Sequence, residues 1–147
     1  MQHILKLPYT VEQLILSDKA LLLGIDNRPP ENVVYNMKHY LIPGLARGRE
    51  ILGFDFTHSS GYRCWRLNRA VGGSETSGHP EGYCEDFWCP AFGTPLDVVH
   101  RLAASDLKFD QLIYEHTWVH ISFDPRLRMQ IKTADFKDGQ PVYKPGA

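Results

Sequence analysis

The sequence predicts an α+β fold, and three features of its 147 residues point to that class. Apolar residues recur at helical spacing over the first third of the chain. Short apolar and aromatic runs, broken by turn-forming residues, follow from about position 51 and are typical of strands. One more helical pattern, TPLDVVHRLAAS, interrupts those runs. Helices followed by strands favour a small antiparallel sheet with helices packed on one of its faces.

The first third is expected to hold two helices. Thr10 opens a pattern that resembles a capping box, and the helix that it starts should end at Gly24. The second helix should begin at Pro29-Pro30, because proline is favoured at the first helical position, and should run to about Leu45. Its buried stripe is expected to comprise Val33, Val34, Met37, Tyr40 and Leu41.

The remainder is expected to form strands and one helix. ILGFDFTHSS, which starts at Ile51, has the apolar and aromatic residues of a strand. YCEDFW is a second strand, on which Cys84 and Asp86 face one side because side chains alternate along a strand. In TPLDVVHRLAAS, Thr94 can cap the helix and Pro95 can occupy its first position.

The segment QLIYEHTWVHISF is typical of a β-hairpin, with His116-Thr117 as its two-residue connection. Pairing across that connection places Ile113 opposite His120 and Glu115 opposite Trp118. Directly opposed residues share a face of a sheet. We therefore expect Glu115 and His120 to be diagonal neighbours on one face.

Composition bounds the class of protein. The length and the 43% apolar content suit one compact domain over residues 1–147. Sixteen Lys and Arg against seventeen Asp and Glu give no sign of a nucleic-acid or membrane surface, and no stretch approaches the ~20 apolar residues of a membrane span. The first residues lack the apolar run of a signal peptide, so we expect a protein that is cytoplasmic at synthesis. We also expect it to be a monomer. The three cysteines form no CxxC and are expected to be reduced.

His79, Asp86 and His120 are candidate ligands of a metal ion. A catalytic zinc takes three protein ligands and keeps an open position, and two imidazoles with one carboxylate suit Zn²⁺ best. Glu115, beside His120 in the predicted hairpin, could act outside the metal as the carboxylate that moves a proton during hydrolysis. Spacing alone leaves open that these histidines are ordinary packed or solvated residues.

The stretch SGYRCWRLNRAVGGSETSGHPEGYCEDF closely resembles the central motif of the zinc D-Ala-D-Ala carboxypeptidase family, which shares its fold with the hedgehog signalling domain and includes phage endolysins. Within it, SGHPEGYCED matches the family pattern S-x-H-x-x-G-x-A-x-D, except that Cys84 replaces the usual alanine. WVHISF resembles the second histidine motif of the family. The resemblance extends from about Tyr9 to Val142.

This resemblance implies a hedgehog/DD-peptidase-like fold with one zinc site. It implies that His79, Asp86 and His120 are the zinc ligands and that Glu115 is the catalytic general base. It also implies that Arg63 is catalytic and substrate-binding, because it would hold the substrate carbonyl or carboxylate and stabilise the oxyanion.

Other positions carry weaker implications. Family members often place the catalytic acid three residues before the last histidine, whereas Glu115 lies five before His120, so Asp110 is the alternative base. His58 and His116 flank the proposed site and could support the metal ligands from outside, but solvated or packing roles are expected for them. Residues that match motif positions and would support substrate binding are Ser77, Trp118 and Ser122. Aromatic side chains that could stack on sugar rings or fill the core are Trp65, Trp88 and Trp118.

The expected function is therefore zinc-dependent hydrolysis of peptide bonds in bacterial peptidoglycan stem peptides. Two modes remain open: a carboxypeptidase that acts on D-Ala-D-Ala ends, or an endopeptidase of the endolysin type. The alternative from another class is a non-catalytic cell-wall-binding or phage structural module of the same fold. Phage and bacterial origins both fit a chain without an export signal, and a phage enzyme would act on the wall after release.

Overall fold

The computed structural model describes residues 3–147, in which seven strands form one mixed sheet. The strands are β1 (His3–Leu5), β2 (Phe56–Ser60), β3 (Cys84–Trp88), β4 (Gln111–Tyr114), β5 (Val119–Ser122), β6 (Gln130–Lys137) and β7 (Gln140–Pro145), in the spatial order β1-β2-β3-β5-β4-β6-β7. Neighbours run antiparallel except β4 and β6, which are parallel. The expectation of a small antiparallel sheet is wrong on both counts, because the chain crosses over after β5 and adds β6 and β7 beyond β4.

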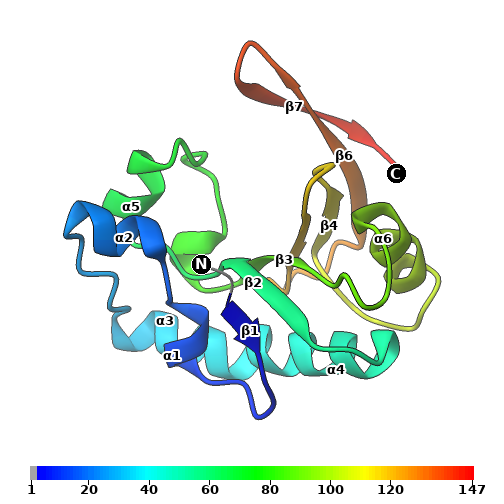
Figure 1. Cartoon of the computed structure of the whole chain (residues 1–147), viewed down its shortest axis with the longest axis horizontal. Coiled ribbons are helices and arrows are strands. Elements are labelled where there is room, and N and C mark those ends of the chain that lie inside the picture. Colours follow the sequence, from blue (N-terminus) through cyan, green and yellow to red (C-terminus); the bar gives the residue numbers. More distant parts are fainter. Residues whose placement is uncertain (1–2) are drawn as a thin grey trace.

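The helical segments surround this sheet (Figure 1). They are α1 (Val11–Leu14), α2 (Asp18–Leu23), α3 (Glu31–Asn36), the π-helical turn η1 (Met37–Leu41), α4 (Ile42–Leu52), α5 (Trp65–Ala70), the 3₁₀ turn η2 (His79–Glu81) and α6 (Pro95–Ala103). Figure 1 shows the β6–β7 hairpin projecting away from the rest of the molecule. In residues 3–147, no helix combines the length and the apolar character that crossing a bilayer requires.

The first predicted helix is in fact two short helices, and β1 before them was not predicted. Thr10 caps α1 as expected, because its hydroxyl accepts a hydrogen bond from the Gln13 N–H. Ser17 then caps α2 in the same way, and Gly24, with φ +65°, ends it. The single-helix prediction failed because Leu21 and Leu22 do not continue the buried stripe: they are 80% and 78% exposed.

The second predicted helix is longer than expected. It continues to Leu52, so Ile51 is helical and does not begin a strand. Pro43 lies inside it, where it has no N–H to donate and its ring would clash with a carbonyl of the preceding α-turn. The π-turn before it widens the backbone, and the Ile42 N–H bonds to the Met37 carbonyl. The helix therefore passes a residue that normally ends helices.

Two α-helices lie between β2 and β4, one predicted and one unpredicted. α6 has the predicted cap: the Thr94 hydroxyl accepts from the Asp97 N–H, and the Asp97 carboxylate accepts from the Thr94 N–H. α5 was missed because its cap is the Cys64 thiol, which accepts from the Leu67 N–H and is not a residue type that marks a helix start.

The core lies on one face of the sheet. α6 contacts β4 and β5, and buried side chains of all three elements belong to this core. Buried members of this core from the strands are Phe87, Leu112, Val119 and Ile121, and those from the helices are Leu45, Val98, Val99 and Leu102. Because side chains alternate along each strand, the residues between these strand positions point to the opposite face. That face carries the candidate site.

Candidate metal centre

The strand register brings three of the predicted site residues onto one face. Asp86 of β3 pairs with His120 of β5, and His120 pairs with Ile113 of β4. The predicted hairpin register is therefore confirmed. The Glu115 N–H donates to the Trp118 carbonyl (3.1 Å), which extends the same register by one pair. Asp86, His120 and Glu115 accordingly share the face opposite the core.

His79 reaches this face from η2, outside the sheet. The Ser77 hydroxyl accepts a hydrogen bond from the His79 N–H (3.1 Å), and Gly82, with φ +83°, ends the turn. The His79 Nδ1 lies 2.6 Å from the Gly61 carbonyl oxygen, to which it donates. This bond fixes the tautomer and leaves Nε2, which lies 3.3 Å from the Asp86 carboxylate, with a lone pair for a ligand.

Asp86 joins the two imidazoles. One carboxylate oxygen faces His79, and the other lies 2.9 Å from the His120 Nδ1. Burial raises the pKa of Asp86, but the imidazoles of His79 and His120 together outweigh burial and lower it, which favours the ionised carboxylate. Burial lowers the pKa of His79, which favours its neutral form. Burial also lowers the pKa of His120, yet the neighbouring Cys84 and Asp86 raise it well above its usual value.

Two overlapping groups of side chains in the described part of the chain could hold a metal ion. One comprises His79, Cys84 and His120, and the other comprises Asp86, Glu115 and His120. In each group the donor atoms lie within 4.8 Å of one another. Nitrogen, oxygen and sulfur donors at this spacing fit zinc. Cys84 was predicted to face the same side as Asp86, but its proximity to both histidines was not predicted.

Glu115 has the environment of a base. The Trp118 indole N–H donates to one of its carboxylate oxygens at 2.8 Å. Burial and then the charge of Asp86 raise the pKa of Glu115. A carboxylate with a raised pKa accepts a proton more readily at neutral pH than an ordinary one.

Asp110, the alternative base, is bound elsewhere. Its two oxygens accept from the Arg128 side chain at 2.9 and 2.8 Å, and one also accepts from the Arg128 N–H. Burial raises the pKa of Asp110, but the Arg128 hydrogen bonds outweigh it and the pKa falls below its usual value. Asp110 belongs to neither metal-binding group found in residues 3–147. The geometry therefore favours Glu115.

Arg63 lies next to this cluster with an unused donor. Its Nε is buried and has no hydrogen-bond partner among the described residues. Its charge lowers the pKa of both His79 and Glu115, which places the guanidinium within electrostatic reach of both. A buried, unpaired donor is costly and calls for an anionic or carbonyl partner.

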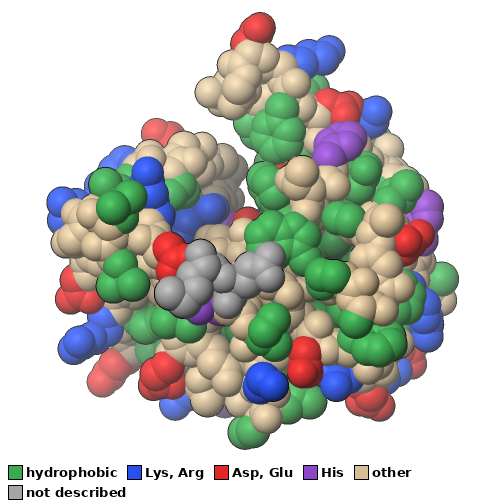
Figure 2. Space-filling model, viewed as in Figure 1, with side chains coloured by type: hydrophobic (Ala, Val, Ile, Leu, Met, Phe, Trp, Pro, Cys, Tyr) green, Lys and Arg blue, Asp and Glu red, His purple; other side chains and the backbone are tan. Residues whose placement is uncertain are grey.

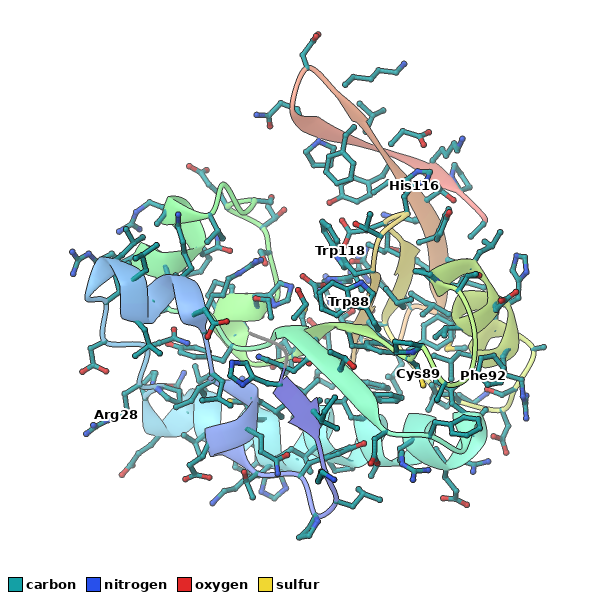
Figure 3. All side chains as sticks on the ribbon, in the orientation of Figure 1. Arg28, Trp88, Cys89, Phe92, His116 and Trp118 are labelled. Atoms are coloured by element: carbon teal, nitrogen blue, oxygen red, sulfur yellow. The ribbon has the colours of Figure 1, made fainter. Side chains whose placement is uncertain are left out.

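The site lies beside a hollow. Figure 2 shows a notch between the lobe that carries α2 and α5 and the side that carries the β6–β7 hairpin. Trp88 and Trp118 lie together at its border, and His116 lies above them at the base of the hairpin (Figure 3). The Trp88 indole donates to the Thr117 carbonyl, which ties the β4–β5 connection to β3. Of the other motif residues, Ser122 accepts through its hydroxyl from the Gln111 N–H at 3.0 Å.

His58 supports the site from the core face. Its Nδ1 lies 2.7 Å from the Glu85 carboxylate, and its Nε2 lies 2.9 Å from the Leu16 carbonyl. Burial lowers the pKa of His58, but Glu85 and the carbonyl raise it to about 9. The pair is fully buried, and Glu85 is the neighbour of Asp86 on β3. His58 therefore has a packing role, as expected, although through an ion pair.

Replacing His58 with leucine is expected to lower the free energy of unfolding by about 3–5 kcal/mol, because Glu85 would be left as an unpaired buried charge. The pKa of His58 is raised on folding. The His58–Glu85 ion pair therefore contributes fully to the free energy of unfolding below pH ~6.5, and this contribution is lost as pH rises through about 9. Urea denaturation at pH 7 and pH 10 measures both effects. The double variant with Glu85→Leu should recover much of the loss, and a double variant as unstable as the single one would contradict this account.

Gly61 is expected to tolerate no side chain. A Cβ there would lie 2.3 Å from the Leu14 carbonyl oxygen and 2.7 Å from the Glu85 carboxylate. Gly61→Ala should therefore lower the free energy of unfolding by about 1–3 kcal/mol. The matched control is Gly48→Ala in α4, whose Cβ would meet only the Phe56 ring at 3.6 Å and should be neutral or stabilising. Thermal melts compare the two, and equal melting temperatures would contradict the steric argument.

Comparison with known families gives one match. The family described as Peptidase M15 matches residues 8–122, which include every candidate site residue named above. None of the curated proteins compared with the chain matches it. The matched segment ends at Ser122, the last residue of β5, so β6 and β7 lie outside it.

Proposed function

Because this chain belongs to the peptidase M15 family, we propose that it is a zinc metallopeptidase that hydrolyses peptide bonds in bacterial peptidoglycan. The observation that carries the proposal is the contact of the Asp86 carboxylate with the imidazoles of both His79 and His120. The Glu115 carboxylate lies within 4.8 Å of donor atoms of Asp86 and His120. A peptidase needs such ligands together with a separate proton carrier.

The donor set fits zinc. The ion would be held by the His79 Nε2, the Asp86 carboxylate and the His120 imidazole. The Gly61 carbonyl orients the His79 ring by accepting a hydrogen bond from its Nδ1. When bound, zinc would supply a Lewis acid that polarises the scissile carbonyl. Cys84 lies within donor distance of both histidines and is an additional side chain that could contact the ion.

The remaining roles belong to residues around these ligands. Glu115 would take a proton from the attacking water and pass it to the leaving amine, while Trp118 holds one of its oxygens. Arg63 would use its unpaired Nε to bind the substrate carbonyl or carboxylate and to stabilise the developing oxyanion. Ser77 would act by fixing the turn that carries His79, because its hydroxyl already serves that backbone.

The proposal is tested by loading the purified protein with zinc and incubating it with peptidoglycan sacculi and, separately, with a free peptide that ends in D-Ala-D-Ala. Mass spectrometry of the products should show new amine and carboxyl ends, and chelation should abolish them. Cleavage of the free peptide alone identifies a carboxypeptidase, whereas cleavage within the polymer identifies an endopeptidase. Zinc binding and sacculus binding without any new ends would instead support the non-catalytic wall-binding module.

A further inference from the structure

The face that carries the candidate metal centre continues into the β6–β7 hairpin, residues 130–145. The register gives one row of neighbours across five strands, because His120 pairs with Asp86 and with Ile113, Ile113 pairs with Lys132, and Lys132 pairs with Pro145. Paired residues share a face. The hairpin therefore presents Lys132 and its alternate neighbours to the same side as the metal ligands.

A second row lies one step along the strands and passes through the proposed base. Extending the β3–β5 and β4–β6 pairings by one residue brings Trp88, Trp118, Glu115 and Ala134 into line, and Ala134 pairs with Tyr143. Ala134 is fully buried and small, so little side chain stands between Glu115 and Tyr143. Consistent with this closeness, burial and then the charge of Glu115 raise the pKa of Tyr143.

The hairpin thus adds an aromatic surface to the site. Phe136 is two residues along β6 from Ala134 on the same face, and its ring centroid lies 6.4 Å from that of Trp118. The Lys132 ammonium lies 5.9 Å from the Tyr143 ring centroid. Phe136 and Tyr143 are 50% and 48% exposed. We call the surface of Trp118, Phe136 and Tyr143 the hairpin platform.

The chemistry of the hairpin platform suits a sugar ring. An exposed aromatic ring stacks well on a partner that has a flat apolar face and whose polar groups stay in water. A pyranose ring is such a partner, because its C–H face is flat and apolar and its hydroxyl groups point outward. The platform itself consists of aromatic side chains, with the Lys132 ammonium beside them as a hydrogen-bond donor. In peptidoglycan, the peptide that is cut is covalently attached to a chain of N-acetylated amino sugars.

The distance from β5 to β7 matches the length of the stem peptide that would connect the scissile bond to the sugar. β7 lies three strand spacings from β5, or about 14 Å. An extended stem peptide of about four residues spans about 13 Å at ~3.3 Å per residue. A stem peptide whose scissile bond lies at His120 can therefore place its sugar at Tyr143.

We propose that the hairpin platform of Trp118, Phe136 and Tyr143 is a glycan subsite, which binds the amino sugar to which the cleaved stem peptide is attached. The inference rests on the proposed peptidase function for its substrate, and it makes glycan-linked peptide the preferred substrate over free peptide. The subsite lies largely outside the family match, because Phe136 and Tyr143 follow residue 122.

The first experiment compares two substrates that share one stem peptide, with and without its disaccharide. Phe136→Ala and Tyr143→Ala should each lower kcat/KM on the disaccharide-linked peptide about two- to tenfold and leave the free peptide unchanged. The control is Val142→Ala, because Val142 is 45% exposed on the same hairpin but pairs with Asp135 on its other face. An equal fall on both substrates would overturn the proposal in favour of a peptide-binding or purely structural hairpin, and no fall on either would also overturn it.

The second experiment does not depend on turnover. Soluble oligomers of N-acetylglucosamine, which contain the sugar and no peptide, are titrated into the wild-type protein while tryptophan fluorescence is recorded. A saturable change that weakens in Tyr143→Ala and persists in Val142→Ala supports the glycan subsite even if neither peptide is cleaved. The absence of any change overturns it even if both peptides are cleaved, so failure of the subsite and failure of the peptidase function are distinguishable.

Discussion

Replacing Glu115 with glutamine is expected to lower kcat about 10²- to 10⁴-fold while leaving zinc content unchanged. Glutamine has the same size and can still accept the hydrogen bond from the Trp118 indole at its amide oxygen, so the geometry of the hairpin should persist. Its amide cannot take a proton from the attacking water. The measurements are steady-state cleavage of a stem peptide and metal analysis of the same preparation.

The pH profile distinguishes this role from a structural one. Because burial and the charge of Asp86 raise the pKa of Glu115, the base should become active only as pH rises past its ordinary range. The acid limb of the wild-type kcat/KM profile should therefore lie above the usual pKa of a glutamate and should vanish in Glu115→Gln. Asp110→Asn is the comparison. If its activity per folded molecule falls as far as that of Glu115→Gln, the base has been assigned to the wrong residue.

The β4–β5 hairpin shows why this part of the site was predictable from sequence. A two-residue connection fixes which residues oppose each other, so the pairing of Ile113 with His120 follows from the sequence alone. The turn itself was the weak point, because few residues other than glycine adopt a positive φ. His116 does so, at +64°, and its ring is held by Asp135 at 3.1 Å and by contact with Tyr114. The stabilising contact comes from β6, which local sequence does not reveal.

Other features depend on contacts that no local pattern encodes. The parallel pairing of β6 with β4 is set by the crossover after β5, and hydrophobic alternation cannot distinguish it from an antiparallel neighbour. The bond between the His79 imidazole and the Gly61 carbonyl joins residues 18 positions apart, through the backbone of a loop. By contrast, the place of Cys84 beside the histidines follows from strand alternation with Asp86, which puts its thiol on the ligand face.

Replacing Asp86 with asparagine is expected to abolish stoichiometric zinc binding. The carboxylate contacts both imidazoles, at 3.3 Å from His79 and 2.9 Å from His120. Loss of a ligand should weaken metal affinity by more than the roughly 10- to 100-fold that follows loss of an outer hydrogen bond. Competition with a chromogenic chelator measures the affinity. The control is Asp135→Asn, which removes a carboxylate from the hairpin and should leave zinc binding intact.

Proton release gives a second measure of the same ligand set. Although burial lowers its pKa, His120 has a pKa well above its usual value because of Cys84 and Asp86, whereas the pKa of His79 is lowered. The raised pKa favours the protonated form of His120, which must lose a proton before its nitrogen can bind a metal. The heat of zinc binding should depend on the ionisation enthalpy of the buffer, with about one proton released per ion, and affinity should weaken as pH falls. A heat that is the same in all buffers would mean that His120 is not a ligand or is already neutral, and either result would remove the electrostatic role assigned to Asp86.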